Sequence, residues 1–377
     1  MNKNLFFLVF FAAFVALSWY VFISGYLALP DNSIVHAVYI PVFVLCSFSF
    51  FLAFSLEKVM RRSIVMIFER IGGFWMISLF YFIAMALLGD LIWLTNYLFG
   101  IYPDFITKNL NETELAYFGL VIFLLILFSI IGYLHFRSPA IVKLKLSISK
   151  RNGNGGKINA VAVSDVHLGD LINRKRLEKY VEMINGCNPD IILIAGDLFD
   201  RNMESVRKQN MQEVLKKLKS KYGTYAILGN HEYIGKTNEA IKIIQESEIK
   251  LLRDSFEVID DLFVLAGRDD LMNKNRKPLS SVIENCNPSL PLIVMDHQPV
   301  RLSDAVENKV DLQISGHTHN GQIVPFNYVV SLFYEMVYGY KKKENTHFYV
   351  SSGLGLWGAP IRLGTKSEIV CFEIDFI

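Results

Sequence analysis

Five short polar loops in the second half of the chain carry residue types that bind metal ions. In chain order they read SDVHLGD, GDLFD, GNHE, MDHQP and GHTHNGQ, and they hold five of the eight histidines. A single such element would mean little, but five in succession form a specific pattern. The candidate ligands are Asp165, His167, Asp197, Asn230, His297, His317 and His319.

The mixture of ligand atoms indicates which metals would bind. Carboxylate oxygen, imidazole nitrogen and amide oxygen together suit borderline divalent ions such as Mn, Fe, Zn or Co, of which we favour Mn. An all-oxygen set would indicate Mg or Ca. Seven ligands are too many for one catalytic zinc but suit two ions that share a carboxylate. Two ions about 3.5–4 Å apart can stabilise the attacking and leaving oxygens of a phosphoryl displacement.

Each loop directly follows a short apolar run that predicts a buried β-strand. In layered α/β folds, ligands bind at the carboxyl ends of strands, which is where these loops lie. Glycines before Asp197, Asn230 and His317 are expected to let the backbone turn sharply there. The runs before the loops lie at residues 158–164, 190–196, 224–229, 292–295 and 312–314; other strands are expected at 141–148, 262–266, 347–351 and 368–374, and helices at 174–184 and 203–219.

This order of strands and helices excludes a single parallel Rossmann sheet with one glycine loop. A two-sheet sandwich flanked by helices fits the pattern better, which places the second half of the chain in the α/β class.

The first part of the chain has a different composition. The hydrophobic fraction is 52% and the mean hydropathy is +0.32, and the excess lies in residues 1–136. Four apolar runs each exceed the roughly 20 residues that a membrane-spanning helix needs. Because the first run is too long for a signal peptide and three more follow, we expect four spans. The runs lie at residues 5–29, 34–56, 74–99 and 115–136.

Basic residues predict the orientation of these spans. They gather before the first span, between the second and third, and after the fourth, while the other two connections hold only Lys108. Since basic loops stay in the cytoplasm, both termini and the soluble domain should face the cytoplasm at the cell membrane. The net charge of +2 argues against a nucleic-acid partner. The basic residues are Lys3, Lys58, Arg61, Arg62, Arg70, Arg137, Lys143 and Lys145.

Taken together, the five loops resemble the motifs of the calcineurin-like metallophosphoesterase superfamily, which are D-x-H, G-D-x-x-D/R, G-N-H-D/E, H and G-H-x-H. The resemblance covers residues 158–375. GHTHNGQ and YVSSGLGLWGAPIRLG (349–364) are further similar to a bacterial membrane-associated phosphodiesterase branch, in which enzymes cleave the pyrophosphate of UDP-diacylglucosamine. Asn320 stands where that branch usually has glycine.

The resemblance implies a four-layer α-β-β-α sandwich preceded by the four-helix transmembrane region. The domains expected from it are a membrane anchor at 1–137, a linker with an entry strand at 138–157, and the metallophosphoesterase domain at 158–377.

It also implies a role for each residue of the site. One metal ion would be held by Asp165, His167 and His319, the second by Asn230, His297 and His317, and Asp197 would bridge the two. A hydroxide between the metals would be the nucleophile. His231 would stabilise the phosphoryl oxygens or protonate the leaving group. Asp200 would support the site by contacting its residues, without binding a metal itself.

An aromatic-rich segment at 324–340 lies next to the last ligands in the sequence. It could be a packed hairpin or core helix, or an interfacial segment that enters the bilayer beside the site. Candidate lipid contacts are Phe326, Tyr328, Phe333, Tyr334 and Trp357.

The leading hypothesis is a hydrolase of phosphodiester or pyrophosphate bonds whose substrate is lipid-linked or close to the membrane. One alternative is a tethered enzyme for soluble substrates, either a nucleotide phosphodiesterase or a phosphomonoesterase. Another is a membrane sensor or transporter without catalysis. Asp90, inside the third span, is either a functional acid or a residue satisfied by a polar neighbour.

Overall fold

The computed structural model describes residues 3–56, 59–149 and 156–377 and divides into two compact units, Met1–Ile131 and Gly132–Ile377. Lys58 and most of the glycine- and asparagine-rich stretch at 151–157 lie outside the described residues.

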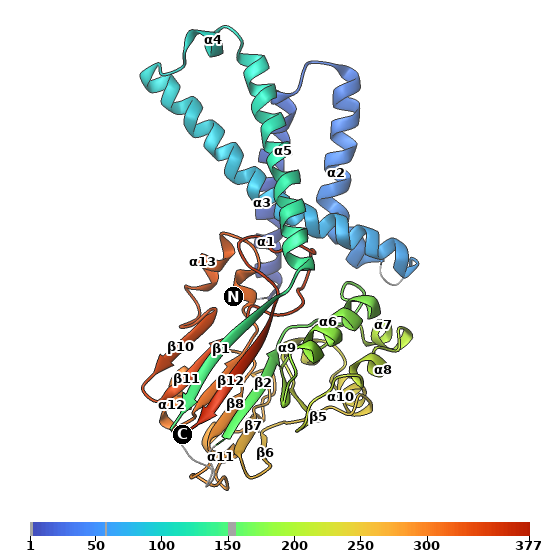
Figure 1. Cartoon of the computed structure of the whole chain (residues 1–377). Helices are drawn as coiled ribbons and strands as arrows, with labels where there is room; N and C mark the ends of the chain where they lie inside the picture. The colour runs from blue at the N-terminus through green and yellow to red at the C-terminus, as the bar shows by residue number, and fades with distance from the viewer. Residues whose placement is uncertain (1–2, 57–58, 150–155) are drawn as a thin grey trace. The chain divides into compact units, whose positions relative to one another are not determined.

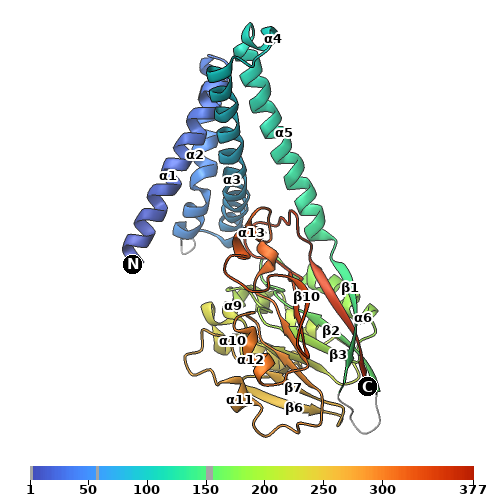
Figure 2. The same cartoon turned by 90° about the vertical axis from the view of Figure 1, so that its left-hand side faces the viewer.

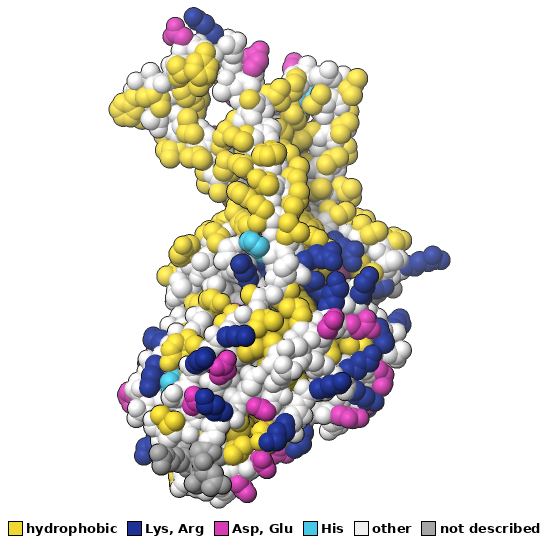
Figure 3. Space-filling model, viewed as in Figure 1, with side chains coloured by type: hydrophobic (Ala, Val, Ile, Leu, Met, Phe, Trp, Pro, Cys, Tyr) yellow, Lys and Arg dark blue, Asp and Glu magenta, His cyan; other side chains and the backbone are white. Residues whose placement is uncertain are grey.

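The first unit is helical (Figures 1 and 2). Among the described residues, four helices are long and apolar enough to cross a membrane, as the sequence predicts. Figure 3 shows hydrophobic side chains over most of their surface. The helices are α1 (Lys3–Ala28), α2 (Ser33–Leu56), α3 (Arg62–Phe99) and α5 (Leu110–Arg137), and the short α4 (Asp104–Thr107) lies between the last two.

Helices α2 and α3 pack closely because Gly72 is buried where they cross. A Cβ atom on Gly72 would lie 2.5 Å from the backbone nitrogen of Phe50. Small residues at such crossings are how membrane helices gain close contact.

The second unit contains two mixed six-stranded sheets within its described residues (Figure 1). In the first sheet the strands that lead into the ligand loops, β2, β3 and β4, run parallel, and β12 is antiparallel to β2. Its strands, in spatial order, are β1 (Ala140–Ile148), β12 (Glu368–Phe376), β2 (Gly156–Val163), β3 (Ile191–Ala195), β4 (Thr224–Ile227) and β5 (Lys250–Leu251).

In the second sheet, the strands that lead into ligand loops are again parallel. Strands β7, β8, β9 and β11 are parallel, and the two edge strands are antiparallel to their neighbours. Its strands, in spatial order, are β10 (Gly339–Lys343), β11 (Thr346–Val350), β9 (Leu312–Ser315), β8 (Leu292–Met295), β7 (Phe263–Gly267) and β6 (Ser255–Ile259).

The side chains of β2 show how the layers form. Ala160 and Ala162 lie in the core between the two sheets, whereas Val161 and Val163 pack with helices on the outer face. A separate core lies between the second sheet and its own helices. The expected two-sheet sandwich flanked by helices is therefore confirmed. The helices are α6 (Arg174–Gly186), α7 (Met203–Lys208), α8 (Met211–Leu215), α9 (Asn230–Ile234) and α10 (Thr237–Glu246) beside the first sheet, and α11 (Leu279–Val282) and α12 (Leu302–Glu307) beside the second.

One predicted helix is wrong in its extent. The expected single helix at 203–219 is the pair α7 and α8, because Asn210 between them has φ = 50°. Asparagine is among the few residues that adopt this left-handed conformation easily, and it ends a helix there.

Candidate metal centre

The structure brings all seven predicted ligands to the carboxyl ends of five strands. Two of the loops follow β2 and β3, one follows β4, and two follow β8 and β9. Because both sheets present these ends at the same edge of the sandwich, residues far apart in the chain meet there.

Asp165, His167 and His319 form the first group of ligands. The Nε2 atoms of His167 and His319 are 3.1 Å apart, and Asp165 Oδ1 is 3.3 Å from His319 Nε2. All three residues are buried. Two imidazole nitrogens and a carboxylate oxygen therefore converge on one small region.

Asn230, His297 and His317 form the second group. Asn230 Oδ1 lies 3.2 Å from His297 Nε2 and 2.7 Å from His317 Nδ1. The other ring nitrogen of His297, Nδ1, lies 2.8 Å from the carbonyl oxygen of Ala195. An Nδ1–H donated to that carbonyl leaves the lone pair of Nε2 for a metal, which is the usual arrangement of a ligating histidine.

Asp197 lies between the two groups. Its Oδ2 atom is 3.9 Å from His167 Nε2 in the first group and 3.2 Å from His297 Nε2 in the second. Its Oδ1 atom accepts a 2.8 Å hydrogen bond from the backbone N–H of His231. One carboxylate is thus within reach of both ligand groups.

These separations fit divalent metal ions. Neighbouring ligands at about 2.1 Å from an octahedral or tetrahedral ion are roughly 3–3.5 Å apart, and most of the distances above fall in or near that range. In the described part of the chain, Asp165–His167–His319 and Asp197–His297–His317 each have ligand atoms within 4.8 Å of one another. The residues present can therefore hold two ions.

Electrostatics favour the metal-binding forms of Asp165, Asp197 and His319. Burial lowers the pKa of His319 well below the usual value, so its imidazole is neutral. Burial alone would raise the pKa of Asp165 and Asp197, but neighbouring histidines lower both. Carboxylates that stay ionised and an imidazole that stays neutral can donate lone pairs without first losing a proton. His297 differs, because burial opposes a charge on its ring but Asp197 raises its pKa well above the usual value.

The backbone at the site is held in uncommon conformations. Asp165, His167, Asp197, His317 and His319 have φ between 48° and 70°. Such left-handed conformations cost energy for residues other than glycine and concentrate at functional sites. The surrounding sheets must impose them, and they aim the side chains inward.

The expected role of the glycines before the ligands is only partly right. Gly196 has φ = 88° and makes the expected turn. Gly229, however, has an ordinary φ of −110°. Gly229 is needed because it has no side chain: a Cβ atom there would lie 2.2 Å from Asp197 Oδ1.

His231 and Asp200 lie together beside the first ligand group. His231 Nδ1 is 3.1 Å from Asp200 Oδ1, and its ring lies 4.4 Å from that of His167 between centroids. Burial opposes a charge on His231, but the hydrogen bond to Asp200 and the charge of Asp197 raise its pKa overall. The ring is therefore oriented by a carboxylate.

Glu232 was missed as a functional residue, although it ends the GNHE motif. Its buried carboxylate accepts hydrogen bonds from the backbone N–H groups of Asp197 (3.2 Å), Phe199 (2.8 Å) and Gly229 (2.7 Å). It fixes the loops after β3 and β4 to one another. The spacing of the motif could have suggested this role.

Arg362 was also missed, because a lone arginine in an apolar loop gives little signal. It is fully buried, and its Nη2 donates to the carbonyls of Ser352 (2.7 Å) and Gly355 (2.6 Å). The same atom lies 3.4 Å from His319 Nδ1. Burial lowers its pKa to about 10, so Arg362 remains a cation next to the candidate ligand His319.

The first part of the aromatic segment is exposed. The short helix α13 (Phe326–Val330) has no buried residue among its five, and Tyr328 and Phe333 are 68% and 76% exposed. Phe326 and Trp357 are exposed as well. The interpretation as a core helix is therefore wrong for α13, whereas the end of the segment is packed, because Met336 is buried and Gly339 and Tyr340 begin the hairpin of β10 and β11.

Tyr334 is the exception among the five candidate lipid contacts. It is partly buried, and its ring lies 5.9 Å from the ring of His317, edge to face. It thus connects the exposed aromatic segment with the second ligand group.

Comparison with known proteins shows which proteins this chain resembles. Residues 158–321 match the family described as Calcineurin-like phosphoesterase. The chain is 31% identical over 249 residues to a protein of Danio rerio named "Transmembrane protein with metallophosphoesterase domain", which covers 61% of this chain and 56% of that protein. It is 30% identical over 227 residues to a metallophosphoesterase of Aquifex aeolicus, covering 58% of this chain and 86% of that protein.

A solved structure, TT1561 of Thermus thermophilus, aligns with 53% of this chain and 90% of its own length, at 12% identity and a TM-score of 0.36. The chain spans less than two thirds of the length of the curated Danio rerio and Bos taurus relatives.

Proposed function

This chain belongs to the calcineurin-like metallophosphoesterase family, and we propose that it hydrolyses a phosphodiester or pyrophosphate bond of a lipid-linked substrate at the cytoplasmic face of the cell membrane. The observation that carries the hydrolytic part is the position of Asp197, whose Oδ2 atom faces ligands of both groups.

The proposed metal assignment follows the two groups. Asp165, His167 and His319 would hold one divalent ion, Mn by preference, and Asp197 would be shared with the second. The second ion would take the remaining ligands, Asn230, His297 and His317. When bound, such ions polarise a phosphoryl oxygen and lower the pKa of water.

The chain's own residues supply positioning and a proton. Asp200 engages Nδ1 of His231, so Nε2 is the ring nitrogen left to meet the substrate. A proton held at Nε2 can pass to the leaving-group oxygen, or can stabilise charge on the phosphoryl group.

The proposal of a lipid-linked substrate rests on the exposed aromatic segment. Phe326, Tyr328 and Phe333 offer apolar surface to the surroundings, and Tyr334 continues that surface to His317. Strand β10 then adds three lysines as candidate contacts for anionic headgroups, of which Lys341 and Lys343 also pair with Glu335. Aromatic side chains favour the interface between hydrocarbon and water. The motif similarity to enzymes that cleave UDP-diacylglucosamine supports the same substrate class.

A substrate panel tests the proposal. The purified full chain with Mn is assayed against bis-p-nitrophenyl phosphate, p-nitrophenyl phosphate and a lipid-linked pyrophosphate in mixed micelles, with Asp197→Asn as the blank. We expect the diester and the lipid pyrophosphate to be cleaved, and the blank to be inactive.

Three results would count against it. A clear preference for the monoester would contradict the diesterase assignment. Absence of lipid cleavage, with rates indifferent to detergent, would contradict the lipid-linked substrate. Unchanged turnover by Asp197→Asn would contradict the metal assignment.

A further inference from the structure

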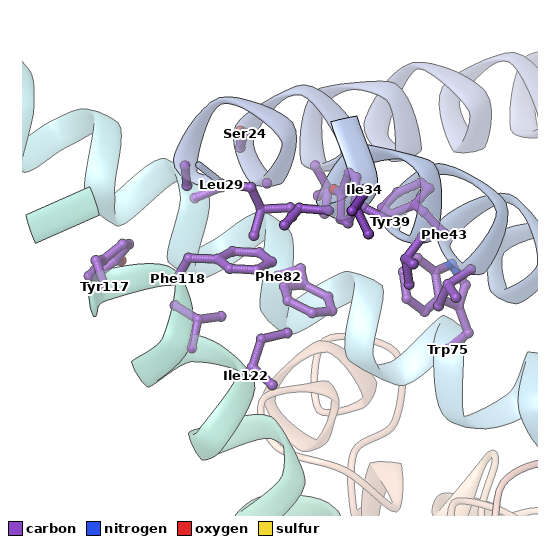
Figure 4. A pocket seen from close by; sticks show the side chains of 18 residues that line it. Ser24, Leu29, Ile34, Tyr39, Phe43, Trp75, Phe82, Tyr117, Phe118 and Ile122 are labelled. Carbon is purple, nitrogen blue, oxygen red and sulfur yellow. The ribbon is translucent and has the colours of Figure 1, made fainter. Parts of the chain in front are cut away.

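The helical unit contains a cavity of about 620 Å³ that lies outside the phosphoesterase domain (Figure 4). This volume is within the range of about 300–1,000 Å³ typical of small-molecule sites. Its walls come from the C-terminal end of α1, the N-terminal half of α2, the middle of α3 and the N-terminal half of α5.

The apolar walls include aromatic rings that pack against one another. Phe43 contacts Trp75 edge to face at 4.9 Å between ring centroids, and Trp75 lies 5.9 Å from Phe82. Tyr39 packs on Phe43 at 5.8 Å. Such mutual support gives the cavity a preformed shape.

The hydroxyl groups in the lining already have partners, and Trp75 Nε1 is the one buried polar side-chain atom of the described lining without one. Ser24 donates to the carbonyl of Tyr20 (2.9 Å), Tyr39 to that of Phe22 (3.0 Å), and Tyr117 to that of Met85 (2.6 Å). A water molecule needs two to four polar partners, so water is a poor occupant. The chemistry of the lining selects a hydrocarbon.

The cavity is open toward the surroundings of the helices. Ile34, Val38 and Val42 belong to its lining and are nevertheless exposed side chains of α2. Since these helices are long and apolar enough to span a membrane, the medium outside this opening is lipid acyl chains.

The cavity lies near the connection from α1 to α2, which is the end of the spans remote from the N-terminus. Acidic side chains predominate in and beside the connections at this end, which hold one lysine, Lys108, and four acids, Asp31, Asp104, Glu112 and Glu114. This negative charge repels anionic headgroups and attracts the ammonium group of a zwitterionic headgroup.

Beside the cavity, Asp90 accepts a 2.5 Å hydrogen bond from Tyr20. The intramembrane acid therefore has a polar neighbour, as one of the two sequence interpretations held.

We propose that this cavity binds an acyl chain of a zwitterionic phospholipid from the leaflet remote from the N-terminus. The site is separate from the metal centre, so the proposal does not depend on the hydrolytic activity.

Photo-crosslinking tests it. The full chain is reconstituted in bilayers that contain phosphatidylethanolamine with a diazirine in one acyl chain, and the labelled peptides are identified by mass spectrometry. We expect labelling concentrated in residues 34–43 and 75–86, competed by unlabelled phosphatidylethanolamine and weaker with a phosphatidylglycerol probe.

Two variants fill the cavity from different walls. Ala86→Trp and Val38→Trp should each lose the concentrated labelling. Their controls, Ala84→Trp and Val44→Trp, place the same ring at exposed positions of α3 and α2 outside the lining and should keep it. Unchanged turnover of bis-p-nitrophenyl phosphate and an unchanged elution volume show that a variant is folded.

The proposal is overturned if the filled variants are labelled like the wild type, or if label spreads evenly over all four helices. Equal labelling by both headgroup probes would overturn the assignment to zwitterionic lipid.

Discussion

His231 directly follows a candidate metal ligand, yet its Nδ1 atom pairs with Asp200. Two adjacent residues of one motif therefore have different partners, which agrees with the different roles proposed for them. Asn230 meets His297 and His317, whereas His231 is the residue proposed to meet the substrate.

At this scale, His231→Asn should lower kcat by about 10²–10⁴-fold, the usual contribution of a general acid. The loss should be larger for alkyl phosphodiesters than for p-nitrophenyl esters, because p-nitrophenolate is stable enough to leave without receiving a proton. Asp200→Asn should cost about 10–100-fold, as supporting residues do. Metal content, measured alongside, should stay at the wild-type level in both variants. Equal losses for both leaving groups would contradict the acid role.

Between elements, the important contact joins the loops after β3 and β4. Glu232 accepts three backbone hydrogen bonds from these loops, so the positions of Asp197 and Asn230 depend on one another. A buried carboxylate satisfied in this way stabilises the geometry as well as the fold.

Glu232→Gln should therefore lower the free energy of unfolding of the second unit by about 1–3 kcal/mol, because the amide NH₂ faces donors that have lost an acceptor. Urea unfolding of the full chain measures this. Glu178→Gln, which removes a surface pair with Arg174, is the control and should change little. A shift no larger than that of the control would show that Glu232 does not fix the loops.

The aromatic segment makes a second prediction at the scale of elements. Tyr328→Ser with Phe333→Ser should reduce hydrolysis of a vesicle-borne lipid substrate several-fold while leaving bis-p-nitrophenyl phosphate turnover unchanged. Lost apolar area at the interface weakens membrane contact but not chemistry. Val258→Ser, at an exposed apolar position on β6, should affect neither assay. An equal loss on both substrates would indicate a structural role instead.

The sequence predicts the fold best where one physical signal dominates. Buried strands such as β3 and β8 are continuous apolar runs, and the ligand loops follow them directly. The edge strand β10, GYKKK, has no such signal because its side chains are mostly exposed. The break at Asn210 and the partners of Arg362 depend on tertiary contacts, which no local pattern reveals.

At the scale of the whole molecule, the number of spans determines whether the N-terminus and the domain after α5 lie on the same side of the membrane. Four spanning helices would put the N-terminus and the domain after α5 on the same side of the membrane, and the basic residues predict that this side is the cytoplasm.

A fluorescent protein fused after Ile377 should therefore be fluorescent, and alkaline phosphatase fused there should be inactive. Alkaline phosphatase fused after Asn109, in the connection between α3 and α5, should be active. The opposite pattern at either position would contradict the proposed orientation.

The central claim is that one carboxylate joins two metal ions. The most direct measurement is the metal-to-protein ratio of the Mn-loaded full chain and of its Asp197→Asn variant, determined by inductively coupled plasma mass spectrometry. We predict two ions per chain in the wild type and at most one in Asp197→Asn, because the amide cannot neutralise and bridge two cations. Two ions retained by the variant, or a single ion in the wild type, would contradict the dinuclear centre.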